Sequence, residues 1–260
     1  MLIDTHCHLD AAEFDGDRDA VQAAAWAAGV RQIIIPAVTV NGFSKTKMVA
    51  ARYPGCVAAY GIHPLYVMQA GEDDMAILAH WLEQARPIAV GEIGLDYFVP
   101  GLDPVRQQAC FEAQLTLARG ADLPVLLHVR RAVDAVLAGV RRHRVRGGIA
   151  HAFNGSAQQA EAFIKLGFKL GFGGAMTFSG STRIRRLAAE LPLESIVLET
   201  DAPDIPPAWL HGGRNTPDQL PAMARVLAEL RGISVEQVMA QTTANARAVL
   251  PGLAQDGLQD

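Results

Sequence analysis

The chain has 260 residues, of which 50% are hydrophobic and 19% are charged, and its formal net charge at pH 7 is -4. This length is typical of one (β/α)8 barrel but also allows two smaller domains, and the composition excludes a disordered or low-complexity chain. The negative net charge argues against a protein that coats nucleic acid through a general basic surface, so any contact with a polyanion must be local.

Cysteine usage and the N-terminal sequence favour a reducing compartment. Cys7, Cys56 and Cys110 are far apart and form neither a CxxC pair nor an even-numbered framework. The first residues contain no basic region followed by an apolar one, and no apolar run approaches the ~20 residues that span a bilayer. We expect a soluble cytoplasmic protein without disulfides, without a membrane segment and without an evident obligate protein partner.

Short apolar or β-branched runs recur along the whole chain and predict eight strands. In chain order they are Leu2–Thr5, Gln32–Pro36, Val57–Tyr60, Ile88–Gly91, Pro124–His128, Gly148–His151, Phe168–Gly171 and Ile196–Thr200. Helical spacing predicts helices between these strands and after the last one. They are Asp17–Ala28, Phe43–Arg52, Asp74–Gln84, Pro104–Ala121, Ala132–Arg142, Ala157–Leu166, Thr182–Glu190, Pro217–Arg231 and Ser234–Val249.

The regular alternation of strand and helix indicates a parallel sheet with right-handed crossovers. Eight such units favour a closed (β/α)8 TIM barrel over an open doubly wound sheet, and no Gly/Ser/Pro-rich linker divides the chain. No GxGxxG or Walker pattern follows any of the strands, which weakens the nucleotide-binding alternatives. We therefore predict an α/β protein with one barrel domain over residues 1–260.

The positions of the histidines point to a site. Five of the eight lie at or just beyond the carboxyl ends of predicted strands: His6, His8, His63, His128 and His151. Two carboxylates share this position, because Glu92 ends the fourth strand and Asp201 follows the eighth. In a (β/α)8 barrel these ends converge on the face where barrel enzymes carry out their chemistry. We expect one cluster of imidazoles and carboxylates around a single mouth.

Such a cluster has the composition of a metal site. His6 and His8 are two residues apart on a strand, so both side chains leave the same face and can bind one cation. An isolated HxH pair is as readily structural, but so many buried titratable groups without a metal would carry a heavy desolvation cost. Six ligands suffice for two divalent ions that share a carboxylate: His6, His8, Glu92, His128, His151 and Asp201. Zn, Mn, Fe, Co or Ni suit this set, and Mg suits it when a substrate phosphate completes the coordination.

Several motifs in order carry a resemblance to a known family. They are residues 3–10 (IDTHCHLD), 61–64 (GIHP), 91–96 (GEIGLD), 127–130 (LHVR), 151–156 (HAFNGS) and 198–203 (LETDAP), followed by Thr243-Ala244-Asn245. The chain resembles the TatD family of metal-dependent hydrolases, within the amidohydrolase superfamily, from residue 3 to about residue 250.

This resemblance implies a (β/α)8 barrel with a pair of divalent metals and deoxyribonuclease activity, often as a 3′ to 5′ exonuclease on DNA ends or oligonucleotides. It implies that His6 and His8 bind the first metal, which Asp201 completes. It also implies that Glu92 bridges both metals and that His128 and His151 hold the second. One departure exists, because many relatives follow His63-Pro64 with a second histidine where this chain has Leu65.

The expected mechanism is hydrolysis of a phosphodiester by a water molecule that the metal pair activates. Glu92 and Asp201 are the predicted catalytic carboxylates, and Asp201 orients the water or accepts its proton. Three further carboxylates are predicted to orient ligands. For Asp4 and Glu199 the alternative is a buried structural hydrogen bond, and for Asp96 it is a loop cap.

The predicted substrate contacts are His63, Arg130 and Arg214. Either arginine can bind a phosphate as a fork, although loop arginines are usually only solvated. Phe98, Phe153 and Phe178 lie near strand ends, where they either stack on bases or pack in the core and rim. The glycine-rich stretch 171–174 either admits a closely approaching group or permits a tight turn.

Three functions are compatible with this cluster. The first is a phosphodiesterase acting on nucleic acid ends, the second an amidohydrolase that cleaves a C–N or ester bond of a small metabolite, and the third a binding scaffold without activity. Many C–N hydrolases of the superfamily bridge their metals with a carboxylated lysine, and residues 87–94 contain Glu92 but no lysine. The first function is therefore favoured. The sequence leaves open which metal is bound, whether DNA, RNA or a small phosphodiester is preferred, whether cleavage is exo or endo, and the oligomeric state.

Overall fold

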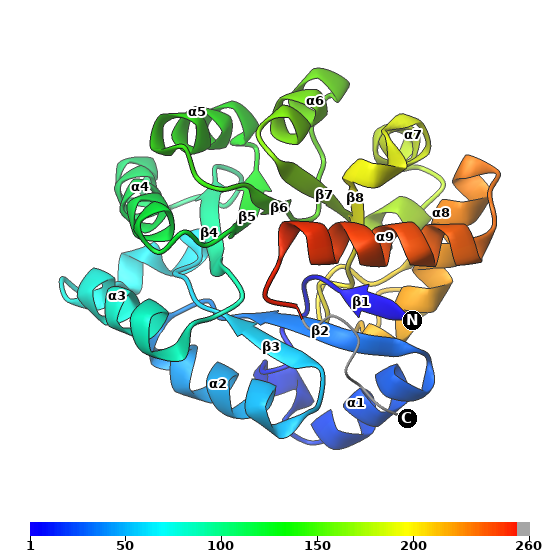
Figure 1. The fold of residues 1–260 in the computed structure, drawn as a ribbon, viewed down its shortest axis with the longest axis horizontal. Coiled ribbons are helices and arrows are strands. Elements are labelled where there is room, and N and C mark those ends of the chain that lie inside the picture. Colours follow the sequence, from blue (N-terminus) through cyan, green and yellow to red (C-terminus); the bar gives the residue numbers. More distant parts are fainter. Residues whose placement is uncertain (254–260) are drawn as a thin grey trace.

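Strands alternate with helices through residues 1–253, the part of the chain that the computed structural model describes (Figure 1). The strands are β1 (Leu2–Asp4), β2 (Val30–Pro36), β3 (Cys56–Ala59), β4 (Val90–Asp96), β5 (Val125–Arg130), β6 (Gly148–Ala150), β7 (Phe168–Phe172) and β8 (Ile196–Leu198). The helices are α1 (Arg18–Ala27), α2 (Phe43–Arg52), α3 (Asp74–Ala85), α4 (Pro104–Gly120), α5 (Val133–His143), α6 (Ala157–Lys165), α7 (Thr182–Glu190), α8 (Leu220–Arg231) and α9 (Val235–Val249).

The strands close into a ring in the order in which they occur along the chain. β1 to β3 form one parallel sheet and β4 to β8 a second parallel sheet. A parallel bridge between Tyr60 and Val90 joins the two sheets on one side. On the other side the amide of Thr5 donates to the carbonyl of Leu198 at 3.1 Å. The predicted (β/α)8 barrel is therefore confirmed.

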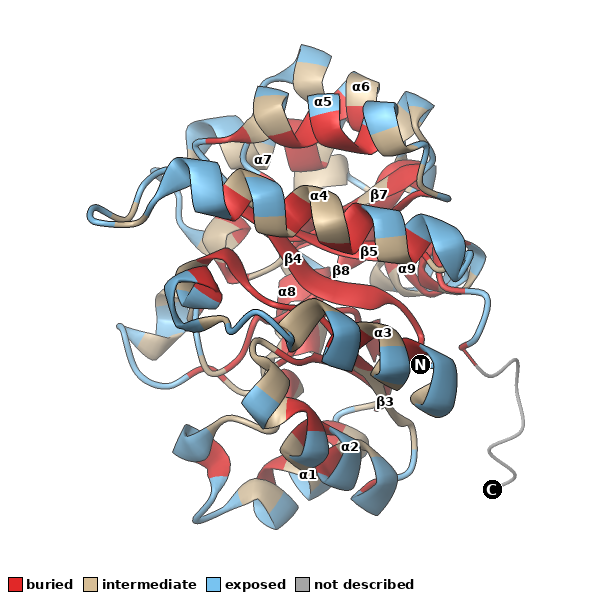
Figure 2. Ribbon diagram, turned by 90° about the vertical axis from the view of Figure 1, so that its left-hand side faces the viewer, coloured by how far each residue is buried: buried red, intermediate tan, exposed pale blue. Residues whose placement is uncertain are grey.

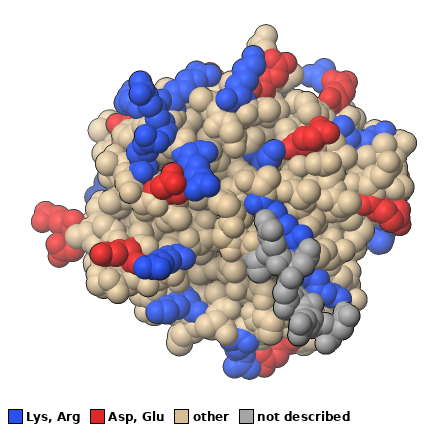
Figure 3. All heavy atoms as spheres, in the orientation of Figure 1, with Lys and Arg blue, Asp and Glu red and all other residues tan. Residues whose placement is uncertain are grey.

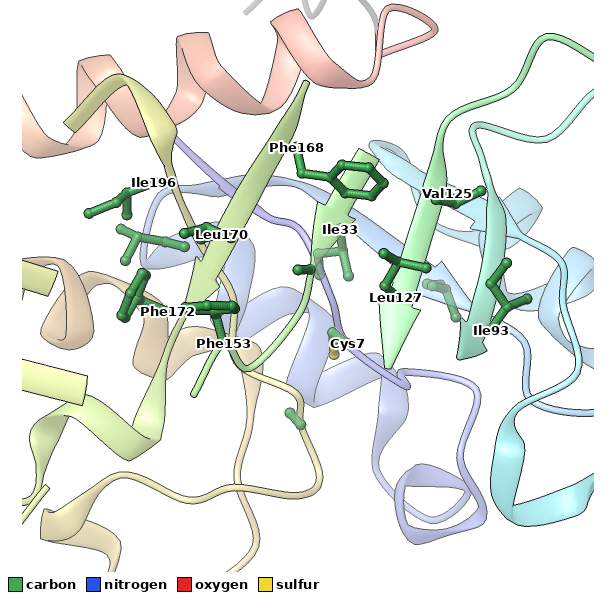
Figure 4. Close-up of a cluster of buried hydrophobic side chains, with 14 of the residues drawn as sticks. Cys7, Ile33, Ile93, Val125, Leu127, Phe153, Phe168, Leu170, Phe172 and Ile196 are labelled. Atoms are coloured by element: carbon green, nitrogen blue, oxygen red, sulfur yellow. The ribbon is translucent and has the colours of Figure 1, made fainter. Parts of the chain in front are cut away.

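Alternate residues of several strands, β2 among them, enter two different apolar clusters. Ile33 and Ile35 of β2 pack in the larger cluster, together with residues of the surrounding helices, and Figure 4 shows part of this cluster between the strands. Ile34 packs in a smaller cluster to which β5 contributes Leu126 and β8 contributes Val197. Strands that are buried on both sides read as continuous apolar runs, which explains why the sequence indicated them so clearly. In Figure 2 most strand residues are buried, although β3 and the end of β5 are partly accessible, whereas the helices are buried on one side and exposed on the other.

Helix α9 closes the end of the barrel that lies away from the histidines. Its residues Ala246 and Val249 pack in the smaller cluster, as do Leu250 and Leu253, and Figure 1 shows α9 lying across this end. On the same face Figure 3 shows Lys and Arg side chains gathered over α4 and α5. Arg142 there pairs with Glu112. The basic run at the end of α5 is thus part of a charged surface remote from the site.

The structure moves several predicted boundaries. β4 begins at Val90 and continues to Asp96, beyond the predicted end at Gly91, so Glu92 lies within a strand and does not end it. The last loop before α8 contains a separate 3-10 turn at Pro217–Gln219, where the sequence predicted helix. Residues 254–260 of the predicted domain lie outside the described residues. No helix in residues 1–253 is both long and apolar enough to cross a membrane.

Candidate metal centre

The carboxylate of Glu92 lies at the centre of the cluster, and its two oxygens face different histidines. Oε2 lies 3.1 Å from Nε2 of His6 and 3.4 Å from Nε2 of His8. Oε1 lies 3.1 Å from Nδ1 of His128 and 3.5 Å from Nε2 of His151. A carboxylate whose oxygens face two separate groups of ring nitrogens has the arrangement of a bridging ligand.

Asp201 supplies a second carboxylate on the Oε2 side. Its Oδ1 lies 3.6 Å from Nε2 of His6 and 3.7 Å from Nε2 of His8. Ligand atoms of these three residues all lie within 4.8 Å of one another, as do those of His6, Glu92 and His151. The six side chains that the sequence assigned to metal binding therefore meet at one place.

The backbone around Asp201 fixes the direction of its carboxylate. Its amide donates to the carbonyl of His6 at 2.8 Å, which ties the loop after β8 to the loop after β1. Asp201 has a φ of 59°, in the left-handed region that costs a residue with a Cβ about 1 kcal/mol or more. Ala152, which follows His151, has a φ of 45°. Strain of this kind persists only where the surrounding structure imposes it, and both residues adjoin or belong to the cluster.

Hydrogen bonds at the outer nitrogens determine what the imidazoles present to Glu92. Nδ1 of His8 donates to the carbonyl of Pro36 at 3.2 Å, and Nε2 of His128 donates to Asp96 at 3.1 Å. In the neutral tautomers the inner nitrogens, Nε2 of His8 and Nδ1 of His128, therefore carry lone pairs. Lone pairs that face a carboxylate require a positive charge between them, supplied by a proton or by a cation.

The pKa shifts of these groups also indicate that positive charge is needed beside Glu92. Burial opposes charge on His8 and His151, but nearby carboxylates raise the pKa of His8 to about 9 and that of His151 to about 10. Burial would raise the pKa of Glu92, yet the surrounding imidazoles hold it well below its usual range. Burial, with the charge of the stacked His151 ring 3.9 Å away, lowers the pKa of His6. An anionic carboxylate held among imidazoles fits divalent cations, which replace these protons.

His63 also lies in the cluster, but its ring nitrogen nearest Glu92 carries a hydrogen, whereas the corresponding nitrogens of His8 and His128 carry lone pairs. Its Nδ1 accepts from the amide of Leu65 at 3.2 Å, so the neutral ring carries its hydrogen on Nε2. This Nε2 lies 3.0 Å from Nδ1 of His128 and 3.4 Å from Oε1 of Glu92. Burial lowers the pKa of His63, which favours the neutral form. Although its Nε2 is close enough to hold a cation with Glu92 and His128, its hydrogen bonding makes it a donor.

The three supporting carboxylates hold different parts of the cluster. Asp96 accepts from His128 through Oδ2 and from the amides of Phe98 and Val99 through Oδ1, so it both orients an imidazole and caps a loop. Asp4 accepts from the amides of His6 and Thr200 and from the Thr200 hydroxyl. Asp4 thus braces the backbone on either side of the cluster, and within residues 1–253 its hydrogen bonds go to the backbone and to the Thr200 hydroxyl.

Glu199 supports His151, and a glycine makes room for it. Its Oε1 lies 3.3 Å from Nδ1 of His151 and accepts from the amide of Ala152. A Cβ on Gly171 would lie 2.1 Å from Oε2 of the same carboxylate. The glycine-rich stretch therefore admits the close approach of a buried side chain.

Replacing Gly171 by alanine is expected to destabilise the protein by about 1–3 kcal/mol, because the added methyl group overlaps a buried carboxylate that has little room to move. Chemical denaturation measures the change. Gly180→Ala is the matched control, since its Cβ would meet nothing within 4 Å, and it should change stability by less than ~0.5 kcal/mol. Equal effects of the two substitutions would contradict the packing around Glu199.

Helix α4 contributes two residues that sequence reasoning missed. Gln107 accepts from the amide of Asp96 and donates to its carbonyl, at 2.8 and 2.9 Å. Gln114 holds the amide and carbonyl of Ile62 in the same way, at 2.7 and 3.0 Å. Both side chains are buried. Their spacing of two helical turns, on the inward face of the helix, was the available signal. Together they fix the end of β4 that carries Asp96 and the loop that carries His63.

The cluster opens into a pocket of about 780 Å³, a volume in the usual range for small-molecule sites. His63 and Arg130, two of the predicted substrate contacts, line this pocket. The third, Arg214, does not: both of its terminal nitrogens bond to the carboxylate of Asp17, at 2.6 and 3.0 Å, and its guanidinium lies over Phe14. An ion pair with Asp17 thus occupies the fork of Arg214, and its contact with a substrate phosphate stays a prediction.

Comparison with known proteins agrees with this geometry. Residues 3–251 match the family described as TatD related DNase. The metal-dependent hydrolase YjjV of Escherichia coli K12 is 42% identical over 91% of this chain and 93% of its own length. The crystal structure of that protein superimposes with a TM-score of 0.93 at 40% identity, covering 96% of this chain and 98% of the other.

A further relative is the 3′-5′ ssDNA/RNA exonuclease TatD of Salmonella typhimurium, which is 33% identical over 95% of this chain and 97% of its own length. A TatD family hydrolase of Entamoeba histolytica, only 20% identical, shares the fold with a TM-score of 0.86. The match extends over nearly all of the chain and includes every motif that supplies the cluster. The chain belongs to the TatD family of metal-dependent hydrolases.

Proposed function

We propose that this protein is a phosphodiesterase that removes nucleotides from the 3′ end of DNA, using two divalent cations held around Glu92. The observation that carries the proposal is the division of its two oxygens between His6 with His8 and His128 with His151. The name of the Salmonella relative, an exonuclease, supports the choice of substrate.

A pair of divalent cations would supply an activated water molecule and neutralise the negative charge of the phosphate; Mg, Mn, Zn, Ni and Fe all suit the ligands. The chain itself would do the rest. Asp201 accepts the proton of the attacking water, because its carboxylate lies at the rim of the cluster and lines the pocket. Asp96 and Glu199 keep His128 and His151 in fixed orientations.

Two side chains would contact the substrate. The Nε2 hydrogen of His63 donates to a non-bridging oxygen of the scissile phosphate, and the guanidinium of Arg130 binds an adjacent anionic group. Both line the pocket. The pocket, of about 780 Å³, is also large enough for a terminal nucleotide.

The test is a substrate panel with each divalent metal. The purified protein should shorten single-stranded or 3′-tailed DNA with Mg or Mn and should lose this activity in EDTA. Metal-dependent hydrolysis of a small amide or lactone, with no cleavage of any phosphodiester, would instead assign the chain to the C–N and ester hydrolases of the same superfamily.

Substitution of His63 tests whether this residue donates a hydrogen bond to the substrate or binds a metal. His63→Ala should lower kcat/KM about 10²- to 10³-fold, the usual effect of losing one donor to developing charge, with metal content unchanged. His128→Ala should lower both activity and metal content. Metal analysis of the two purified variants distinguishes the roles, and loss of a metal equivalent from His63→Ala would show that His63 is a ligand.

A further inference from the structure

Arg130, which lines the pocket, and the adjacent Arg131 share one aromatic ring. The guanidinium carbons of Arg130 and Arg131 lie 3.8 and 4.6 Å from the ring centroid of Phe98. Neither guanidinium forms an ion pair or hydrogen bond within residues 1–253, whereas Arg52, Arg142 and Arg214 each pair with a carboxylate. Two cations held close together without a counter-ion repel one another, which makes this position favourable for an anion.

The backbone holds these side chains in place. Arg131 has a φ of 54°, a left-handed conformation that is costly for arginine. Phe98 is 44% exposed, although an aromatic ring of this size is usually buried. Its amide donates to Asp96 at 2.8 Å, and the amide of Tyr97 donates to the carbonyl of Arg130 at 2.9 Å. The left-handed φ of Arg131 and these two hydrogen bonds fix the segments that carry the two guanidiniums and the Phe98 ring.

The position relative to the metal centre is fixed by strand pairing. Asp96 of β4 is the register partner of Arg130 of β5, and Gly94 is the partner of His128. Arg130 thus lies two residues beyond His128 along the same strand, a displacement of about 6.6 Å. A phosphate bound at the guanidiniums is therefore a different phosphate from one bound between Glu92 and His63.

The opposite edge of the mouth has the opposite charge. Asp10 and Glu13, in the loop after β1, and Asp204, in the loop after β8, line the pocket. Lys45 also lines this edge, but it pairs with Asp15 at 2.9 Å. In the barrel β8 and β1 lie across from β4 and β5, so a polyanion is repelled from one edge and attracted to the other. The charge distribution therefore favours a strand that leaves the centre on the side of Arg130.

We propose that Arg130 and Arg131, held by Phe98, form a subsite for the second phosphate of a single-stranded oligonucleotide, one nucleotide away from the phosphodiester at the metal centre. This rests on the proposed phosphodiesterase function and adds to it a defined exit path. Because of this subsite, kcat/KM should be higher for a substrate with two phosphates than for one with a single phosphate. A third phosphate should raise kcat/KM by a smaller factor.

The experiment compares thymidine oligonucleotides dT2, dT3 and dT4, which carry one, two and three internucleotide phosphates, with the manganese-loaded full-length protein. For the wild type, kcat/KM should rise about tenfold from dT2 to dT3 and by less from dT3 to dT4, since one charge-assisted contact is gained at the first step. In Arg131→Ala most of the increase in kcat/KM from dT2 to dT3 should disappear, because KM for dT3 rises while kcat stays the same. The salt dependence of kcat/KM for dT3 should also weaken, with its logarithmic slope smaller by about 0.7.

Arg144→Ala is the matched control. Arg144 is also exposed, also has a left-handed φ, 51°, and lies at the other end of α5, away from the mouth. The Arg144→Ala substitution should leave the ratio of kcat/KM for dT3 to kcat/KM for dT2 unchanged. Equal hydrolysis of dT2 and dT3 by the wild type, or an equal loss on both in Arg131→Ala, overturns the subsite while the phosphodiesterase function stands. Failure to hydrolyse any of the three with any metal overturns both.

Discussion

Glu92→Gln is expected to abolish bound metal and to lower kcat/KM for a phosphodiester by at least about 1000-fold. The two oxygens of Glu92 face separate groups of imidazoles, so the loss of its charge weakens the ligand set at both of the proposed cation positions. Charge stabilisation by metal ions is worth several kcal/mol, and ~4 kcal/mol corresponds to this factor. Glutamine keeps the size of the side chain, so the barrel should still fold.

Metal analysis and thermal unfolding measure this loss. At cation concentrations about 100-fold above Kd, binding stabilises the wild type by ~2.7 kcal/mol, so EDTA should lower its Tm by roughly 5–10 °C. The Tm of Glu92→Gln should hardly respond to EDTA. Glu13→Gln, which removes a carboxylate from the lining of the same pocket, is the control and should retain metal. A Glu92→Gln protein with full metal content would refute the central position of this carboxylate.

Asp201→Asn is expected to lower kcat by about 10²- to 10⁴-fold, the range for loss of a general base. Asparagine can occupy the same left-handed backbone conformation, so the φ of 59° at this position should be tolerated. It cannot accept the proton of an attacking water, however, and it is a weaker ligand beside His6 and His8.

The measurement is kcat at saturating manganese, which compensates for weakened metal binding. Asp204→Asn is the control, because Asp204 lines the same pocket three residues further on but lies apart from the ligand groups. It should change kcat by no more than a few-fold. If raising the manganese concentration restored Asp201→Asn to wild-type kcat, Asp201 would be a ligand without a role in proton transfer.

Strand and helix positions were largely predictable because a (β/α)8 barrel buries its strands on both sides. The two clusters that receive Ile33 and Ile34 of β2 explain why this strand reads as an apolar run. Helix α2 has the predicted bounds, Phe43–Arg52. The end of β4 was not predictable, because Glu92 and Asp96 are polar residues that a strand buries only when they have partners in the fold.

The candidate ligands were predictable because a barrel gathers strand ends, so chemistry-bearing residues there become neighbours whatever their separation in the chain. The role of His63 was harder to predict. Its donor character depends on the amide of Leu65, two residues along the turn, and no residue pattern reports which ring nitrogen accepts a hydrogen bond. For Arg214 the deciding contact is instead a distant one, because its ion-pair partner Asp17 lies almost 200 residues away in the sequence.

The sequence by itself therefore determined the barrel, the family and the set of side chains that meet at its mouth, because periodicity and strand-end position are local properties. Tertiary structure alone decided how these side chains are used. It divided the oxygens of Glu92 between two groups of imidazoles, set the tautomers through Asp96 and Pro36, and placed the guanidiniums of Arg130 and Arg131 over the ring of Phe98. Each of these depends on contacts between segments distant in sequence, and only the closed fold brings those segments together.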